Sequence, residues 1–368
     1  MTVWIIFLSC ILLWVIINRC FLIPFKPGPV QDESEAPFIS ILVPLRNERD
    51  NVDGLIQALQ ASTYEHTEWI FLDDGSTDKT LETLQASTAH VHNVKIIQGR
   101  PLPDGWVGKV HACHQLSEHA RGDYLCFFDA DVRPAPKAVE AALFTSRRYE
   151  AGLVSGFPHF TYQGWLSSLL VPMQHVLILL HLPLAIANFT KLPAASAAHG
   201  AFMFFERKAY DKAGGHAAIK DSLVEDVHFM RLMKKSGARG ILTRVSRFVT
   251  CRMYTDSRST WEGFSKNAFP GIGRSYTALG FISVVYFGLF ILPAFFAVYG
   301  MLNGTLLYTA PLFLTWLIRA VIDWTNYERW WLFVTHPFAA AAFLAVLWRS
   351  AWLHLKKRGF QWKGRRYA

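Results

Sequence analysis

The chain has 368 residues, of which 52% are hydrophobic, and its formal net charge is +9 at neutral pH. This length allows one α/β domain of ordinary size and about 100 further residues. The composition excludes a chain that lies wholly in water, because long hydrophobic runs occur from Val3 to Ile23 and again between about Phe281 and Trp352. We therefore expect membrane segments on both sides of a globular domain.

The positive charge is not an indication of nucleic acid. Its densest part is the tail after the last hydrophobic run, and the sequence contains no RNA- or DNA-binding motif. Anionic lipid headgroups attract basic clusters that lie beside a membrane segment. We therefore expect residues 354–368 to form a basic cytoplasmic tail at the membrane surface, with membrane lipids and no nucleic acid as partners. Its basic residues are Lys356, Lys357, Arg358, Lys363, Arg365 and Arg366.

The first hydrophobic run predicts a membrane anchor over residues 1–26. No basic residue precedes the run and no small-residue cleavage site ends it, so it does not resemble a signal peptide. Arg19 and Lys26 lie at its carboxyl end, which places the following domain in the cytoplasm. The five cysteines form no CxxC pair, which suits a reducing compartment and indicates no zinc site. Residues 27–37, with several prolines and acidic residues, predict a linker.

From Phe38 onward, apolar runs alternate with helical patterns. Helices are expected from about Asn51, from about Thr77, through His111 and from about Lys137. This alternation predicts an α/β domain with a doubly wound, mostly parallel sheet over residues 38–275. In such sheets ligands bind beyond the carboxyl ends of the strands, so the polar motifs there should converge on one crevice. The predicted strands are residues 39–44, 69–74, 94–99, 124–131 and 152–157.

Two later regions are apolar. The segment 165–189 contains Pro172, Pro183 and internal polar residues, so we expect it to lie in the membrane interface, with a buried core helix as the alternative. The C-terminal transmembrane region, residues 276–353, holds three candidate spans at about 279–301, 306–322 and 331–352. Because a basic tail favours the cytoplasm, an even number of crossings is expected, with one candidate lying shallow or re-entrant.

Asp129 and Asp131 follow an apolar run that predicts a strand. Residues at i and i+2 at the end of a strand point to the same side of it, and paired carboxylates suit Mg²⁺ or Mn²⁺. A metal held there can neutralise the charge that develops on a diphosphate leaving group. On its own, the tripeptide Asp129-Ala130-Asp131 is more often a surface turn. A metal site is favoured here because the tripeptide follows an apolar run that predicts a buried strand.

Asp73 and Asp74 end another predicted strand. Gly75 allows a tight turn after them, and Ser76 or Thr77 can cap the next helix. One residue is enough for a cap, whereas two adjacent carboxylates repel each other unless they bind something. We therefore expect the pair to recognise the base and ribose of a nucleotide, with capping alone as the alternative.

Glu225 and Asp226 stand at the start of a helical pattern. Ser222, three residues before Glu225, completes a capping-box pattern and so explains Glu225. Asp226 is left without a structural explanation. A carboxylate near a helix amino terminus stays ionised, and it can act as the general base that deprotonates an acceptor hydroxyl or carboxylic acid.

Lys109 and His199 each allow two interpretations. Lys109 stands at a predicted helix start, where it can contact a diphosphate or have only a structural role, and its surroundings lack the spacing of a nucleotide-binding phosphate loop. For His199 a hydrogen-bonded core position is favoured over a role in the site, because nothing in the sequence identifies a partner.

These motifs, in this order, resemble those of the family 2 glycosyltransferases with the GT-A fold, and the resemblance covers about Phe38 to Arg274. The runs LPDGWVGKVHACHQ from Leu102 and WKGRRY from Trp362 look most like the bacterial carotenoid-acid and hopanoid-associated membrane glycosyltransferases. The matching pieces are VPLRNERDN from Val43, LDDGSTD from Leu72, DAD from Asp129, HGAFMFFERKAYDKAGG from His199 and VED from Val224.

The resemblance implies a role for each matching residue. Pro44, Glu48 and Asp74 would face the nucleoside of a nucleotide-sugar, for which UDP-glucose is the expected donor. Asp129 and Asp131 would face the ribose, the diphosphate and the metal. The catalytic domain would lie on the cytoplasmic face of a multi-pass protein of the cell membrane.

The resemblance further implies that Asp226 is the base of an inverting displacement. One departure concerns Lys266. The Q-x-x-R-W motif of processive polysaccharide synthases is absent, and WEGFSKN from Trp261 stands in its place. Lys266 can supply the positive charge for the diphosphate, or it can contact solvent or a lipid headgroup.

The expected function is transfer of one sugar to a lipid-like acceptor, such as a carotenoid acid or another polyprenoid. A processive polysaccharide synthase is one alternative, but it needs a polymer channel and the absent motif. A non-enzymatic membrane protein that binds nucleotide is the other, and it gives no reason for Asp226 or for the paired aspartates.

Overall fold

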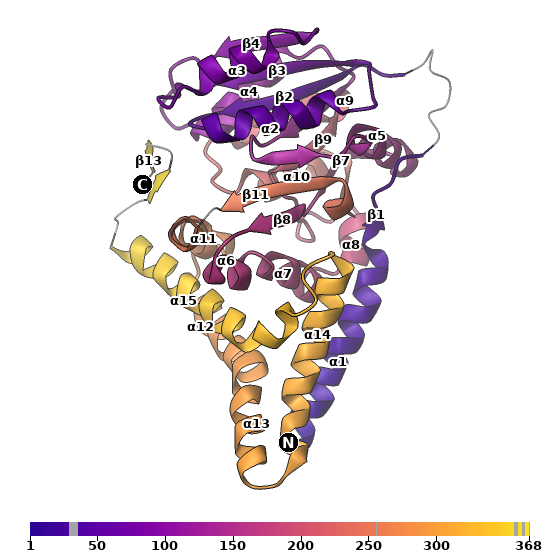
Figure 1. The fold of residues 1–368 in the computed structure, drawn as a ribbon. Coiled ribbons are helices and arrows are strands. Elements are labelled where there is room, and N and C mark those ends of the chain that lie inside the picture. Colours follow the sequence, from indigo (N-terminus) through magenta and orange to yellow (C-terminus); the bar gives the residue numbers. More distant parts are fainter. Residues whose placement is uncertain (29–35, 255, 357–359, 363–364, 368) are drawn as a thin grey trace. The chain divides into compact units, whose positions relative to one another are not determined.

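The computed structural model describes residues 1–28, 36–254, 256–356, 360–362 and 365–367. The chain divides into two compact units, which are described separately (Figure 1). The sheet unit comprises Leu22–His159 and Pro183–Arg252, and the helical unit comprises Met1–Phe21, Phe160–Leu182 and Met253–Ala368. Part of the predicted linker and part of the predicted basic tail, including Lys357, Arg358 and Lys363, lie outside the described residues.

The sheet unit contains an eight-stranded sheet with the order β1-β10-β7-β9-β5-β2-β3-β4. Its pairs are parallel except those of β9, which runs antiparallel to both β5 and β7. The predicted α/β class with a mostly parallel sheet is therefore confirmed. The strands are β1 (Ile23–Pro24), β2 (Ile39–Leu45), β3 (Thr67–Asp73), β4 (Val94–Gln98), β5 (Tyr124–Phe128), β7 (Ala151–Gly156), β9 (Phe202–Glu206) and β10 (Arg239–Arg244).

The central strands are buried on both faces, which is why they read as continuous apolar runs. Every residue of β3 is buried. Glu68 is one of the two buried carboxylates of this strand, and it accepts hydrogen bonds from Ser40 Oγ at 2.7 Å and from Arg121 N at 2.7 Å. Burial alone would raise the pKa of Glu68, but these bonds and the Arg121 guanidinium lower it below its usual value.

Helices cover the sheet: α4 packs on β2 and β3, α5 on β7, and α8 on β10. Short strands β6 (Val132–Pro134) and β11 (Val249–Tyr254) pair antiparallel beyond β5. Strand β8 (His159–Tyr162) begins at the last residue of the range Leu22–His159, and β12 (Phe360–Trp362) and β13 (Arg365–Tyr367) belong to the helical unit. The helices of the sheet unit are α2 (Arg49–Gln60), α3 (Thr80–Thr88), α4 (Gly108–His119), α5 (Ala138–Tyr149), α8 (Leu184–Phe189), α9 (Arg207–Lys212) and α10 (Glu225–Lys235).

The predicted cap of α3 is wrong. The helix begins at Thr80, later than the expected Thr77, and neither Ser76 nor Thr77 caps it. Ser76 Oγ instead accepts a hydrogen bond from Asn47 N at 2.9 Å. Asp78 Oδ1 accepts one from Thr80 N at 3.2 Å, so this aspartate satisfies the helix start.

Lys234, on the last turn of α10, is buried inside the sheet unit. Its ammonium group donates hydrogen bonds of 2.6 Å to the carbonyl oxygens of Ala187 and Ala195. It thereby ties the end of α8 and the chain that follows it to α10. A buried ammonium is unfavourable without such partners, and burial lowers the pKa of Lys234 to about 8.

Replacing Lys234 by methionine should lower the free energy of unfolding by about 1–3 kcal/mol, because two buried carbonyl groups lose their donor. Thermal denaturation of the detergent-solubilised protein measures the effect. Lys235→Met is the matched control, since this neighbouring side chain is exposed. Equal melting temperatures for the two variants would show that the buried bonds contribute nothing.

The helical unit holds the long apolar helices of the chain. Within the described residues, four helices are long and apolar enough to cross a membrane: Thr2–Phe21, Tyr276–Leu302, Leu306–Thr325 and Leu332–Leu355. The last three correspond to the predicted C-terminal candidates, while the number of crossings stays a prediction. The unit's helices are α1 (Thr2–Asn18), α6 (Trp165–Leu170), α7 (Met173–His181), α11 (Ser257–Gly271), α12 (Tyr276–Tyr286), α13 (Leu292–Leu302), α14 (Ala310–Thr325) and α15 (His336–Leu355).

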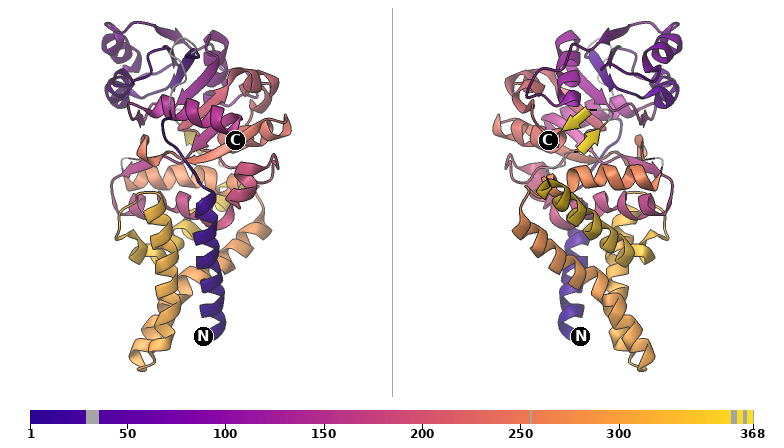
Figure 2. Two further views of the ribbon diagram at one scale, coloured as in Figure 1. Left: turned by 90° about the vertical axis from the view of Figure 1, so that its right-hand side faces the viewer. Right: turned by 90° about the vertical axis from the view of Figure 1, so that its left-hand side faces the viewer.

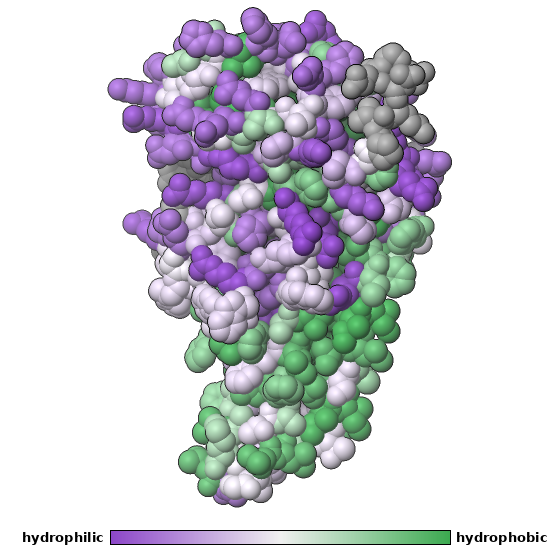
Figure 3. Space-filling model, turned by 45° about the vertical axis from the view of Figure 1, so that its right-hand side comes forward, coloured by the Kyte–Doolittle hydropathy of each residue, from purple (hydrophilic) through white to green (hydrophobic). Residues whose placement is uncertain are grey.

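Helices α1 and α14 lie side by side (Figure 2). The surface of this part of the unit is apolar (Figure 3). Exposed apolar side chains on α1 and along the stretch from α12 to α14 include Val3, Ile6, Phe281, Val284, Phe295, Leu302, Leu306 and Phe313. Such a surface is unfavourable in water and suits contact with lipid.

The segment 165–189 consists of three short helices, α6, α7 and α8, that are interrupted near Pro172 and Pro183. Proline has no N–H group, so Pro183 leaves the carbonyl of Leu179 without its helical donor. Asn18 on α1 supplies the replacement, because its Nδ2 donates to Leu179 O at 2.9 Å and to Leu182 O at 2.7 Å. The prediction that this segment lies in a membrane interface is neither confirmed nor contradicted by this arrangement.

The helical unit also buries charge. Arg319 on α14 is fully buried, and its Nε donates to both carboxylate oxygens of Asp323, at 2.7 and 2.9 Å. Glu328 accepts a hydrogen bond of 3.0 Å from the Tyr162 hydroxyl. An ion pair and a hydrogen bond of this kind allow charged residues to remain within an apolar bundle.

Candidate active site

The polar residues that follow strands β2, β3 and β5 lie at one edge of the sheet. Strands β5, β2 and β3 are adjacent and parallel, so their carboxyl ends point the same way. Pro44 pairs with Leu72 near the end of β2, and Asp73 is the last residue of β3. Asp129 follows the end of β5 directly. The sheet therefore brings these positions to the edge where open α/β folds bind ligands.

Asp73 and Asp74 are both buried, each with 6% of its surface exposed. Asp73 Oδ2 accepts a hydrogen bond from Ser76 N at 3.2 Å, while its Oδ1 has no hydrogen-bond partner among the described residues. The backbone carbonyl of Asp74 accepts a hydrogen bond from the Arg46 guanidinium. A buried carboxylate oxygen without a donor costs free energy, so Asp73 Oδ1 can accept a hydrogen bond from a ligand.

Glu48 stands at the amino end of α2. Its backbone N donates to Thr80 Oγ1 at 2.8 Å, and its Oε2 accepts from Asn51 Nδ2 at 2.8 Å. These bonds connect the loops that follow β2 and β3. The roles of Pro44, Glu48, Asp73 and Asp74 in donor binding stay predictions.

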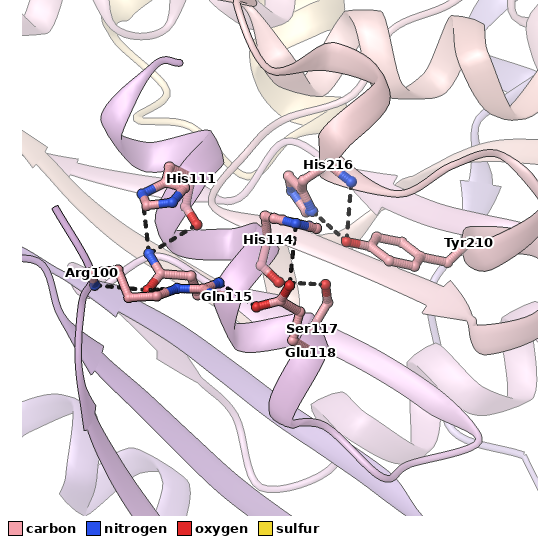
Figure 4. A network of polar contacts seen from close by, with 8 residues as sticks. All are labelled: Arg100, His111, His114, Gln115, Ser117, Glu118, Tyr210 and His216. Atoms are coloured by element: carbon pink, nitrogen blue, oxygen red, sulfur yellow. Dashed lines mark hydrogen bonds and ion pairs between the residues drawn. The ribbon is translucent and has the colours of Figure 1, made fainter. Parts of the chain in front are cut away.

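A polar network fixes helix α4, which carries Lys109. Gln115 on this helix accepts a hydrogen bond of 2.8 Å from Arg100 N, and the two residues can be seen in Figure 4. Arg100 also forms an ion pair with Glu118 of the same helix, as the same view shows. The start of the helix is held as well, because Val107 N donates to Lys220 O at 2.7 Å. Lys109 therefore extends from a helix that is anchored on several sides.

Lys109 contacts Asp129, the first of the two aspartates that follow β5. Its ammonium nitrogen lies 2.7 Å from Asp129 Oδ1 and 3.0 Å from Asp129 Oδ2. It also lies 2.9 Å from Glu225 Oε1. Burial would lower the pKa of Lys109, but the two carboxylates outweigh this effect and raise it well above its usual value. The ammonium therefore stays charged.

Asp131 lies beside Cys251 on β11. Burial together with the nearby Asp131 charge raises the pKa of the Cys251 thiol well above its usual value. The backbone carbonyl of Asp131 accepts a hydrogen bond of 3.0 Å from Arg252 N. The pairing of β6 with β11 thus holds the residues that flank this aspartate.

The predicted capping box at α10 is wrong. The residue that precedes the helix is Val224, and no side chain caps it. Ser222 Oγ lies 2.6 Å from His228 Nδ1 instead, and Glu225 is occupied by Lys109. The sequence pattern failed because Ser222 lies too far before the helix start to act as its cap.

Asp226 occupies the first turn of α10. Its Oδ2 accepts a hydrogen bond from Gly200 N at 3.1 Å, and its Oδ1 accepts one from Val227 N at 2.8 Å. Burial and the neighbouring Glu225 charge raise the pKa of Asp226 to about 7, with the two backbone bonds and Lys109 opposing the shift. The expectation of a carboxylate held ionised by the helix start therefore needs correction. A pKa near neutrality suits a general base.

Gly200 is a site residue that the sequence analysis missed. A Cβ atom built on it would lie 3.0 Å from Lys109 Nζ and 3.1 Å from Glu225 Oε1. A side chain there would thus press on the ion pair. The signal in the sequence was the glycine after His199, but its neighbours come from distant parts of the chain.

His199 is hydrogen-bonded, as the sequence analysis favoured. Its Nδ1 accepts from Ala201 N at 3.2 Å, and its backbone N donates to Ser155 Oγ at 3.0 Å. Lys266 lies on α11 of the helical unit. Its contact with a diphosphate stays a prediction.

The donor set suits a divalent cation that is shared with a substrate. Within the described residues, no group of three or more His, Cys, Asp or Glu side chains is placed to hold a metal ion. Mg²⁺ is commonly bound by one or two carboxylates together with substrate phosphates and water. Two aspartates separated by one residue after β5 fit that mode, although Asp129 is already paired with Lys109.

Residues 40–214 match the model of the family described as "Glycosyl transferase family 2". The backbone resembles that of the mannosyltransferase PcManGT from Pyrobaculum calidifontis, solved in complex with GDP-Man and Mn²⁺. Its TM-score is 0.57 at 17% sequence identity, and the match covers 97% of this chain and 99% of that one. The fold and the family model together define a glycosyltransferase with the GT-A fold.

Two curated relatives make the relationship more specific. The 4,4'-diaponeurosporenoate glycosyltransferase of Staphylococcus aureus (strain MRSA252) is 26% identical over 352 residues, which are 90% of this chain and 88% of the relative. The enzyme of the same name from Staphylococcus haemolyticus (strain JCSC1435) is 25% identical over 273 residues, 72% of this chain and 69% of the relative. The family model and these relatives support a family 2 glycosyltransferase related to carotenoid-acid glycosyltransferases, in agreement with the resemblance seen in the sequence.

Proposed function

We propose that this glycosyltransferase moves a single sugar from a nucleotide-sugar to a carotenoid acid or another polyprenoid lipid, with inversion at the anomeric carbon. The observation that carries the proposal is the arrangement of Lys109, Asp129, Glu225 and Asp226 at the carboxyl edge of the sheet. UDP-glucose is the proposed donor. The names of the staphylococcal relatives support an acid of the carotenoid class as the acceptor.

The proposed chemistry assigns each residue one task. Asp73 and Asp74 receive the nucleoside, and Lys109 and Lys266 face the diphosphate. Asp226 accepts the acceptor's proton, or orients the acceptor if it is already a carboxylate, on the side opposite the leaving diphosphate.

Asp129 and Asp131 would hold Mg²⁺ or Mn²⁺, which when bound neutralises charge on the diphosphate. The Mn²⁺ in the mannosyltransferase structure supports a divalent ion of this kind. The role of the other residues does not depend on which of the two ions is used.

The helical unit is proposed to lie in the cell membrane, with the sheet unit on the cytoplasmic face. Its four apolar helices and exposed apolar side chains support this placement. A membrane position would bring an amphiphilic acceptor to the enzyme. The processive synthase remains the second candidate, and the absent Q-x-x-R-W motif argues against it.

Lipid extracts of cells with and without the gene test the proposed acceptor. Mass spectrometry should find a polyprenoid lipid that carries one hexose only when the gene is present. A polysaccharide in place of such a lipid would favour the processive alternative.

Engineered cysteines at Thr161 and Lys191 should both be labelled from the cytoplasmic side, in a background without Cys10 and Cys20. The reason is that Asp131 precedes the segment 165–189 and Asp226 follows it, and one donor cannot be reached from both sides of a bilayer about 30 Å thick. A cysteine at Thr2 serves as the control and should be labelled from the outside. Labelling of Thr161 and Lys191 from opposite faces would overturn both the interfacial placement and the single site.

A further inference from the structure

The Lys109 ammonium joins two motifs that are distant in the sequence. It contacts both oxygens of Asp129, at 2.7 and 3.0 Å, and one oxygen of Glu225, at 2.9 Å. The side chains of Lys109, Asp129 and Glu225 are 35%, 29% and 15% exposed, so the group is shielded in part from water. One cation thus balances two carboxylates.

Gly200 leaves room for this ammonium. A Cβ atom at that position would lie 3.0 Å from the Lys109 nitrogen, so a side chain there would crowd it. Glu225 offers a second anionic partner on α10. Lys109 can therefore leave Asp129 and still keep an ion pair.

We propose that Lys109 is the counter-ion of Asp129 in the empty enzyme and that it moves from Asp129 to the diphosphate when the donor binds with its divalent cation. The inference rests on the proposed function, because it needs Asp129 in a cation site. Both oxygens of Asp129 are in contact with the ammonium, which therefore occupies lone-pair positions that a divalent cation on this carboxylate would use. Two cations on one carboxylate also repel each other.

This exchange makes cation and nucleotide bind together. A divalent cation that binds alone must displace Lys109 from Asp129, and the ammonium then gains no new anionic partner. A cation that arrives with a nucleoside diphosphate brings the anion that receives Lys109. The coupling is reciprocal, so each ligand should raise the affinity for the other by the same factor.

The proposal is tested by measuring the affinity of the solubilised full-length protein for Mn²⁺, once without UDP and once with it. Electron paramagnetic resonance detects the bound Mn²⁺. In Lys109→Met the affinity for Mn²⁺ alone should rise roughly 5-fold, the scale of a partly exposed ion pair, because Asp129 has lost its competitor. The affinity for Mn²⁺ in the presence of UDP should fall roughly 10-fold, because the diphosphate loses a charged contact. Lys208→Met removes the same charge from an exposed position on α9 and should change neither value.

Opposite signs for the two affinities are the signature of the exchange, since a merely structural role would shift both in one direction. Lys109→Gln keeps hydrogen-bond donors for both carboxylates and is measured as well, so that misfolding of the methionine variant does not decide the result. Unchanged affinities, or affinities that fall together in both variants, would overturn the proposal. The proposed metal site is tested separately with Asp131→Ala. If this variant and the wild-type protein have the same affinity for Mn²⁺ in the presence of UDP, the metal site is refuted.

Discussion

Replacing Asp226 by asparagine should lower the rate of sugar transfer by roughly 100-fold or more while donor affinity changes only a few-fold. The carboxylate sits on the first turn of α10, where Gly200 N and Val227 N hold it by hydrogen bonds of 3.1 and 2.8 Å. Asparagine keeps the size and one acceptor oxygen but cannot take a proton. Transfer kinetics and separate donor titrations distinguish the two effects.

Asp211→Asn is the control for this substitution, because that aspartate is exposed on α9, where it forms an ion pair with Arg207. It should leave transfer unchanged. A loss of donor affinity in Asp226→Asn that equals its loss of turnover would place Asp226 in the nucleotide site.

The pH dependence of transfer should report the same residue. Asp226 is a base only when ionised, and its pKa is raised to about 7 by burial and by Glu225, with Lys109 opposing. Transfer should therefore rise with pH through about 7 and then level off. A rate that is constant between pH 5 and pH 8 would argue against Asp226 as the base.

Replacing Asp131 by alanine should abolish metal-dependent donor binding without unfolding the protein. The substitution removes an oxygen ligand from the proposed diphosphate site, while the neighbouring backbone bond from Arg252 N to the Asp131 carbonyl oxygen remains possible. Isothermal titration with UDP and Mn²⁺ measures the binding, and circular dichroism on heating checks the fold.

Chelation of the wild-type enzyme gives the matching test without a mutation. Excess chelator should stop transfer, and added Mn²⁺ or Mg²⁺ should restore it. Unchanged turnover in excess chelator would refute the metal assignment for both aspartates.

The sequence predicted the buried strands best, because a strand that is buried on both faces is also a continuous apolar run in the sequence. Strands β2 and β3 were predicted because strands buried on both faces require continuous apolar runs. The placement of Asp129 after β5 followed from the same reasoning, since a parallel sheet aligns its carboxyl ends.

The contacts between distant motifs could not be predicted from the sequence. The pattern at Ser222 suggested a capping box, yet Glu225 pairs with Lys109 from another helix. Gly200 looked like an ordinary glycine until its neighbours were known. Likewise, the prolines of the segment 165–189 indicated interruptions, but nothing local identified Asn18 as the donor that satisfies the freed carbonyl groups. Such pairings depend on the tertiary fold.

Transfer in vitro tests the central claim most directly. Purified protein in detergent is incubated with UDP-glucose, Mn²⁺ and a carotenoid acid, and the lipid product is analysed by mass spectrometry, with Asp226→Asn in parallel. We expect the acid to gain the mass of a single hexose with the wild-type protein and far less product with the variant. Release of free glucose without a glycosylated lipid, formation of a polymer, or equal product from both proteins would contradict the proposal that Asp226 directs one sugar onto a lipid acid.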